Sequence, residues 1–123
     1  MANKKKILCI DDDVELLNAL KIILESGGFT VITAESEDDG INKFKESKPD
    51  LVLLDLMMEN TDSAVNFMNQ IKKEGALPPI YLLSSVGTDF YQNVDINQFG
   101  FSGAFQKPID PQNLLKLINT RLS

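Results

Sequence analysis

The side chains best suited to chemistry in this sequence are three carboxylates, one hydroxyl and one ammonium, each at the end of a short apolar run. They are Asp11, Asp12, Asp55, Ser84 and Lys107. Gathered carboxylates repel one another unless a cation lies between them, and oxygen ligands suit Mg²⁺, which readily bridges to phosphate. A carboxylate can also attack phosphorus to form an aspartyl phosphate, with a metal ion offsetting the charge. These residue types therefore indicate phosphoryl transfer.

Short apolar runs alternate with amphipathic stretches along the chain, and this alternation predicts the fold. The apolar runs predict strands at residues 7–10, 29–34, 51–54, 79–83 and 104–107. The amphipathic stretches predict helices after the N-cap residues Asp13, Ser36 and Asp110, one from about Ser63, and a weakly periodic one over residues 89–99. With no linker or repeat, the pattern predicts an α/β domain with a parallel sheet, right-handed crossovers and helices on both faces.

The candidate residues all lie at the carboxyl ends of predicted strands, which is where open parallel sheets bind ligands. Taken singly, each has a plainer explanation, because acids suit a helix N-terminus and serine is common in turns. Because the candidate residues lie together on several strand ends of one sheet, a shared site explains them better. X–Pro bonds are the only common cis peptide bonds, and a cis bond between Lys107 and Pro108 would aim the lysine inward.

Composition excludes several classes of function. The length of 123 residues fits one domain, and the net charge of −6 argues against a direct nucleic-acid partner. Without histidine, the chain cannot use Ser–His catalysis or His-ligated zinc. The single cysteine, Cys9, lies in an apolar run, so we expect it to be a buried core residue in a reducing cytoplasm. No stretch is long enough to span a membrane, and we predict a cytoplasmic protein.

The motifs resemble those of receiver domains from two-component response regulators along nearly the whole chain. The resemblance rests on the pair Asp11-Asp12, on Asp55 within LVLLDLMM, on Ser84-Ser85 and on Lys107-Pro108. It implies one receiver domain over residues 1–123 and a flavodoxin-like (βα)5 sandwich, whose five-stranded parallel sheet has the order 2-1-3-4-5.

The resemblance also implies a role for each site residue. Asp55 would be the phosphoacceptor, Ser84 the hydroxyl that moves toward the phosphoryl group, and Lys107 its ion-pair partner. Asp12, Asp55 and the backbone carbonyl of Met57 would bind Mg²⁺ directly, with Asp11 acting mainly through water.

A switch of this family takes its phosphoryl group from another protein. The donor would be a phosphohistidine of a sensor histidine kinase or of a histidine phosphotransfer protein. The chain would be no metabolic enzyme, with at most self-phosphorylation and self-dephosphorylation activity. Its cognate kinase and its output partner or output domain are not identified by the sequence.

Three features depart from the family's usual pattern. Glu59 and Ser63 replace a proline and a glycine, which predicts a less rigid and more acidic loop after the third strand. Ala104 stands where the family usually has Tyr or Phe, so the aromatic half of the usual switch is missing. Met57 and Val86 are apolar at positions that tune water access in the family, which predicts a long-lived phosphoryl group.

Alternative functions follow from the same residues. A pseudo-receiver that binds partners without phosphorylation is compatible with Ala104. Phe105 does not replace the missing aromatic residue, because strand alternation sends it to the opposite face, where we expect it in the core. A phosphohydrolase with an aspartyl nucleophile usually carries a second acid two residues after that nucleophile. Met57 occupies this position here, which argues against a phosphohydrolase. A flavodoxin is disfavoured because the acids after the first strand would repel a flavin phosphate.

Overall fold

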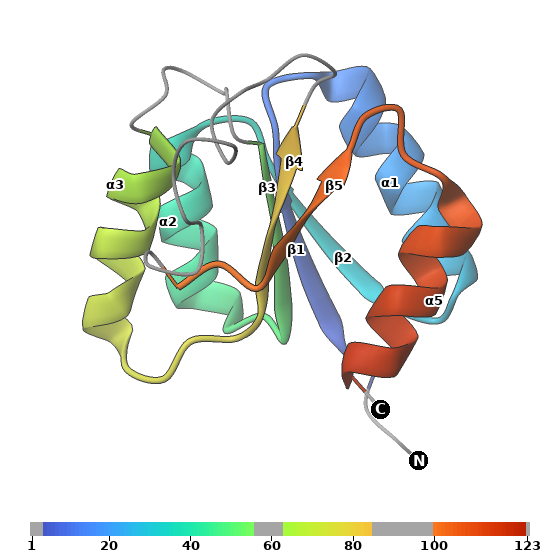
Figure 1. Ribbon diagram of the computed structural model, residues 1–123. Helices are drawn as coiled ribbons and strands as arrows, with labels where there is room; N and C mark the ends of the chain where they lie inside the picture. Colours follow the sequence, from blue (N-terminus) through green and yellow to red (C-terminus); the bar gives the residue numbers. More distant parts are fainter. Residues whose placement is uncertain (1–3, 56–62, 85–99, 123) are drawn as a thin grey trace.

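The computed structural model describes residues 4–55, 63–84 and 100–122 (Figure 1). In chain order the elements are β1 (Lys6–Ile10), α1 (Val14–Ser26), β2 (Thr30–Ala34), α2 (Glu37–Ser47), β3 (Leu51–Asp55), α3 (Ser63–Ile71), the 3-10 turn η1 (Lys72–Glu74), β4 (Ile80–Ser84), β5 (Gly103–Gln106) and α5 (Pro111–Leu122). The strands and helices predicted within these ranges are confirmed to within a residue or two. The helix expected over residues 89–99 lies outside the described residues.

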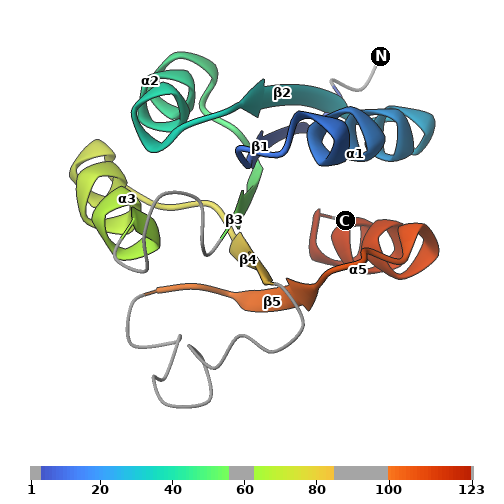
Figure 2. The same cartoon turned by 90° about the horizontal axis from the view of Figure 1, so that it is seen from above.

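The sheet has the predicted architecture. Its strands run in the order β2-β1-β3-β4-β5, and every neighbouring pair is parallel. Helices α1 and α5 cover one face, and α2 and α3 cover the other (Figure 2). Since all five strands point the same way, their carboxyl ends lie along one edge, here called the carboxyl edge.

The core lies in two layers, one on each face of the sheet. Every residue of β3 and β4 is buried, as expected of central strands covered on both faces. Successive residues alternate between the layers: Leu54 and Leu82 pack with the α2–α3 layer, whereas Leu53 and Leu83 pack with the α1–α5 layer. This packing on both faces fixes the position and the direction of each strand end.

The ends of the helices follow the predicted capping residues. The Asp13 carboxylate accepts the Leu16 backbone N–H at 3.2 Å, and the Ser36 hydroxyl accepts that of Asp39 at 3.1 Å. Helix α2 ends at Ser47, and its C-cap residue Lys48 has left-handed geometry with φ of 49° and precedes Pro49. Asp13 is significant for the site because it fixes the turn between β1 and α1.

The last strand differs from its prediction by one residue. Because Gly103 to Gln106 pair with Tyr81 to Ser84, β5 ends before Lys107. The Lys107 backbone N–H still donates to the carbonyl oxygen of Ser84 at 2.7 Å. This hydrogen bond holds the Lys107 backbone at the end of β4. Because Lys107 lies beyond β5, the direction of its side chain is not set by the alternation of side chains along that strand.

Candidate functional site

Three of the predicted site carboxylates meet at the carboxyl edge. Asp11 and Asp12 follow β1, and Asp55 is the last residue of the adjacent strand β3. One oxygen from each of the three carboxylates lies within 4.8 Å of the other two. The sheet therefore brings together acids that are 44 positions apart in the chain, from 11 to 55.

Lys107 supplies the positive charge in this cluster. Its Nζ lies 2.9 Å from Asp11 Oδ2 and 3.5 Å from Asp55 Oδ1. The side chain comes from the chain just after β5, across the sheet from β1, and the Lys107–Pro108 peptide bond is cis. The ammonium thus lies between the two carboxylates. Sequence reasoning assigned the lysine to the phosphoryl group and did not anticipate that Asp11 would be its nearer partner.

Asp11 and Asp12 occupy very different environments although they are adjacent. Asp11 is fully buried, whereas Asp12 is exposed. Asp11 Oδ1 accepts the backbone N–H of Asp13 at 2.9 Å. Asp11 Oδ2 is buried without a well-directed hydrogen bond among the described residues, so its contact with Lys107 is chiefly one of charge. Asp11 therefore positions both the turn and the lysine, while Asp12 faces the solvent.

The electrostatics of the site follow from this burial. Desolvation alone would lower the pKa of Lys107, but the contact with Asp11 and the charge of Asp55 outweigh it, so the pKa lies above its ordinary value. Lys107 is thus an ammonium throughout the physiological pH range. Below the cluster, burial together with the negative charge of Asp11 raises the pKa of Cys9 to about 12. Cys9 is a buried thiol in β1, as predicted, and is no nucleophile.

The residues at the carboxyl edge fit a hard divalent cation. Carboxylate oxygens are the ligands that Mg²⁺ prefers. Asp12 and Asp55 each offer a carboxylate oxygen close to one of Asp11, and the buried Asp11 Oδ2 has no well-directed hydrogen bond among the described residues. The cluster of Asp11, Asp12 and Asp55 could therefore hold a metal ion.

Of the remaining residues predicted for the site, the structure describes Ser84 but not the loop that follows β3. Ser84 ends β4 and is fully buried, and the neighbouring Leu83 pairs with Asp55 across the sheet. Met57, Glu59 and Val86 lie outside the described residues. Ser63 begins α3, and its side chain is likewise not described.

The residues around β5 differ from the rest of the site in their packing. Ala104 is exposed, whereas Phe105 is partly buried and packs on the opposite face, against Tyr81 with ring centroids 5.5 Å apart. Phe101 is buried in the α2–α3 layer. As predicted, Phe105 packs against the core and does not replace an aromatic residue at position 104.

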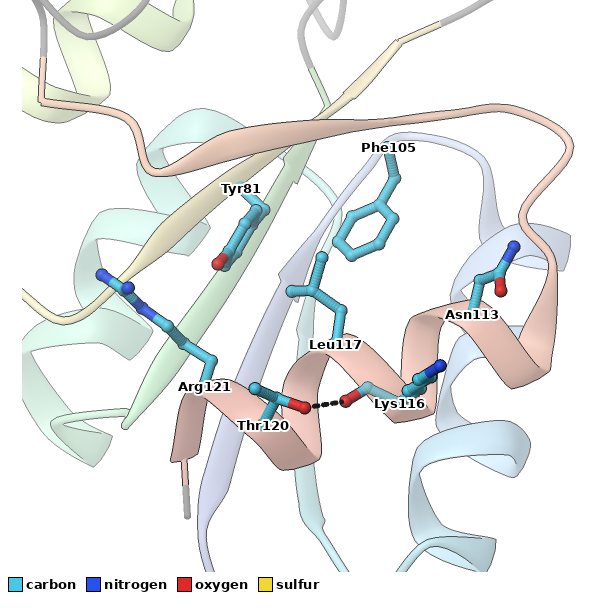
Figure 3. Close-up of a pocket in the computed structure, with 7 residues that line it drawn as sticks. All are labelled: Tyr81, Phe105, Asn113, Lys116, Leu117, Thr120 and Arg121. Carbon is cyan, nitrogen blue, oxygen red and sulfur yellow. Dashed lines mark hydrogen bonds between the residues drawn. The ribbon is translucent and has the colours of Figure 1, made fainter.

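A cleft of about 650 Å³ separates β5 from α5 (Figure 3). The rings of Tyr81 and Phe105 form its sheet side, and Leu117 points at them from α5. Its rim is polar and basic, with Asn113, Lys116, Thr120 and Arg121. This cleft contains none of the clustered acids, so it is a separate feature from the site at the carboxyl edge.

Comparison with known proteins identifies the family. The model of the response regulator receiver domain matches residues 7–119. The chain belongs to this family. ResD, a transcriptional regulatory protein of Bacillus subtilis, is 32% identical over 120 residues, which cover 98% of this chain and 49% of ResD. PhoP of the same organism, named for alkaline phosphatase synthesis, is 29% identical over 110 residues, or 89% of this chain and 45% of PhoP. The receiver therefore spans about half the length of these relatives.

Solved structures agree with this assignment. A response regulator receiver domain protein from Clostridium thermocellum is 30% identical with a TM-score of 0.83, covering 96% of this chain and 94% of that one. The chemotaxis protein CheY4 of Vibrio cholerae has a TM-score of 0.84 at 22% identity, covering 98% and 100%. The fold is thus the flavodoxin-like fold of CheY-like receivers. Within the described residues, no helix combines the length and the apolar character that crossing a bilayer requires.

Proposed function

We propose that this receiver is a Mg²⁺-dependent phosphoryl switch, formed by the chain as one domain, in which Asp55 is the phosphoacceptor. The observation that supports this most is the contact of Lys107 with both Asp11 and Asp55. It puts a permanent positive charge beside the carboxylate that would react. Asp55 is largely buried yet ends its strand at the carboxyl edge, where a donor can approach.

The transfer requires one bond to form and one to break. An Asp55 carboxylate oxygen attacks phosphorus while the bond from phosphorus to the donor's imidazole nitrogen breaks, and the leaving imidazole keeps that electron pair. The donor would be a phosphohistidine of a sensor histidine kinase or phosphotransfer protein. Lys107 would then pair with a phosphoryl oxygen, and the Ser84 hydroxyl would donate to another.

The metal would be held by Asp12 and Asp55, with the Met57 carbonyl as a third ligand and Asp11 acting through water. When bound, Mg²⁺ supplies positive charge that offsets the charge of the transferring group. Asp11 remains the residue that holds Lys107 and the β1–α1 turn in place.

Intact mass spectrometry after incubation with a small acyl phosphate and Mg²⁺ tests this proposal. We expect wild type to gain the mass of one phosphoryl group and Asp55→Asn to gain none. Asp50→Asn is the matched control, because Asp50 precedes the same strand at its opposite end. EDTA should abolish the gain.

An unlabelled wild type would contradict the proposal and favour a pseudo-receiver, the alternative that the exposed Ala104 supports. Equal labelling of Asp55→Asn would place the reaction on another residue.

A further inference from the structure

The outer face of α2 and α3, here called the α2–α3 face, carries opposite charges at its two ends. A cleft of about 690 Å³ beside the first turn of α2 is lined by two carboxylates, Glu37 and Asp38, and by the Asn66 and Gln70 amides of α3. A second cleft of about 250 Å³ lies at the other end of α2. Its charged lining consists of Lys45, Lys48 and Glu74, so two positive charges face one negative. The net charge of the face therefore changes sign along α2.

One stripe of α2 connects the two clefts. Asp38, Asn42 and Lys45 follow one another at the spacing that places helical residues on the same side. All three are exposed. At 1.5 Å rise per residue, Asp38 and Lys45 are about 10 Å apart along the axis, with Asn42 between them. The stripe is thus a short row of negative, neutral and positive side chains.

The charges of this stripe lack partners within the described parts of the chain. The ion pairs there join Lys43 to Asp39 and Lys107 to the site carboxylates. Lys43 also donates to the carbonyl oxygen of Thr33, so it is directed toward the sheet. Asp38 and Lys45 therefore form no ion pair with any residue that the structure describes.

A row with opposite charges at its two ends is complementary to a second copy of the same row that runs in the opposite direction. We propose that the α2–α3 face binds a second copy of this chain, with the two α2 helices antiparallel about a two-fold axis near Asn42. Asp38 of each copy then faces Lys45 of the other, because a two-fold interface makes every contact twice. The two Asn42 amides meet at the axis, where each can both donate and accept. The α3 amides add no charge that would oppose the contact, whereas the exposed Glu46 beside Lys45 reduces the attraction.

Physical magnitudes limit the strength of this association. Each copy carries a net charge of −6, but that repulsion is largely screened beyond about 8 Å at physiological ionic strength. Ion pairs in contact persist, although exposed pairs are individually weak. We therefore expect a weak dimer whose population rises with protein concentration. This inference goes beyond the proposed function and requires no phosphorylation.

Sedimentation velocity of the full chain at increasing concentration, in physiological salt, tests the proposal through charge reversal. Wild type is expected to shift from monomer toward dimer. Asp38→Lys and Lys45→Asp each place like charges opposite one another twice, and each should weaken self-association at least about tenfold. An equimolar mixture of the two variants should dimerise again, because each supplies the charge that the other lacks. The double variant should also dimerise.

Matched controls separate this face from others. Lys21→Asp on α1 and Lys116→Asp beside the β5–α5 cleft change the charge by the same amount as Lys45→Asp and should leave the dimer intact. Because Asp38→Lys removes a favourable charge from the first turn of α2, thermal denaturation of each variant verifies that it is folded. A wild type that stays monomeric, a mixture that fails to recover, or a dimer disrupted by Lys116→Asp instead would overturn the proposal.

Discussion

At the carboxyl edge a lysine and two buried carboxylates contact one another, whereas on β5 a single methyl group stands exposed. Lys107 lies within 3.5 Å of both Asp11 and Asp55, while Ala104 has no bulk to transmit a movement. Ala104 lies three positions before Lys107, so one short segment belongs to both regions. Under the proposed function, the charges that would receive a phosphoryl group are held in place by the sheet, whereas position 104 lacks a bulky side chain that could change its position in response.

The largest expected effect comes from removing the lysine at the carboxyl edge. Lys107→Met leaves Asp11 and Asp55 without their cation, so urea denaturation in EDTA should show a loss of about 2–3 kcal/mol. Mg²⁺ should bind the variant several-fold more tightly by calorimetry, because it no longer competes with the ammonium.

The matched control is Lys43→Met, which breaks a more exposed pair with Asp39. Because it also removes the hydrogen bond from Lys43 to the Thr33 carbonyl oxygen, it should cost about 1–1.5 kcal/mol, and it should leave Mg²⁺ affinity unchanged. Equal losses from the two variants would show that the lysine at the carboxyl edge has no special electrostatic role.

The second-largest expected effect concerns the exclusion of water from β1, beneath the site carboxylates. Burial raises the pKa of Cys9 from 9.0 to about 12. A raised folded-state pKa contributes stability that is complete below pH 9 and is lost as the pH rises toward 12, because the unfolded thiol ionises first. At pH 10 this should lower the free energy of unfolding of wild type by about 1.4 kcal/mol.

Cys9→Ala isolates the thiol from the other groups that titrate in this range. Its stability should fall less steeply between pH 8 and pH 10 than that of wild type, whatever its starting value. Parallel curves would indicate that water reaches β1 beneath the acids.

The smallest effect on stability should come from β5. Because Ala104 is exposed, Ala104→Tyr should change the free energy of unfolding by no more than about 0.5 kcal/mol and should not change the rate of phosphorylation. Chemical shifts of β5 amides should respond more to phosphorylation in this variant than in wild type. A slower phosphorylation rate would show that the two regions are not separable.

The sequence was sufficient to predict the sheet, because apolar runs and capping residues such as Asp13 and Ser36 act locally. It also placed the acids and Lys107 at one edge, since strand ends in a parallel sheet must meet. It could not give the preference of Lys107 for Asp11, which depends on the packing of a flexible side chain. The left-handed backbone of Lys48 was also not predictable from the sequence, because glycine or asparagine is the usual residue in this conformation at the end of a helix.

The assignment of Asp55 as the phosphoacceptor can be tested by identifying the residue that carries the phosphoryl group. Borohydride reduces an aspartyl phosphate to homoserine, so the modified position can be read by peptide mass spectrometry after phosphorylation. We expect homoserine at position 55 and at no other acid. Homoserine at position 11 or 12, with Asp55 intact, would contradict it.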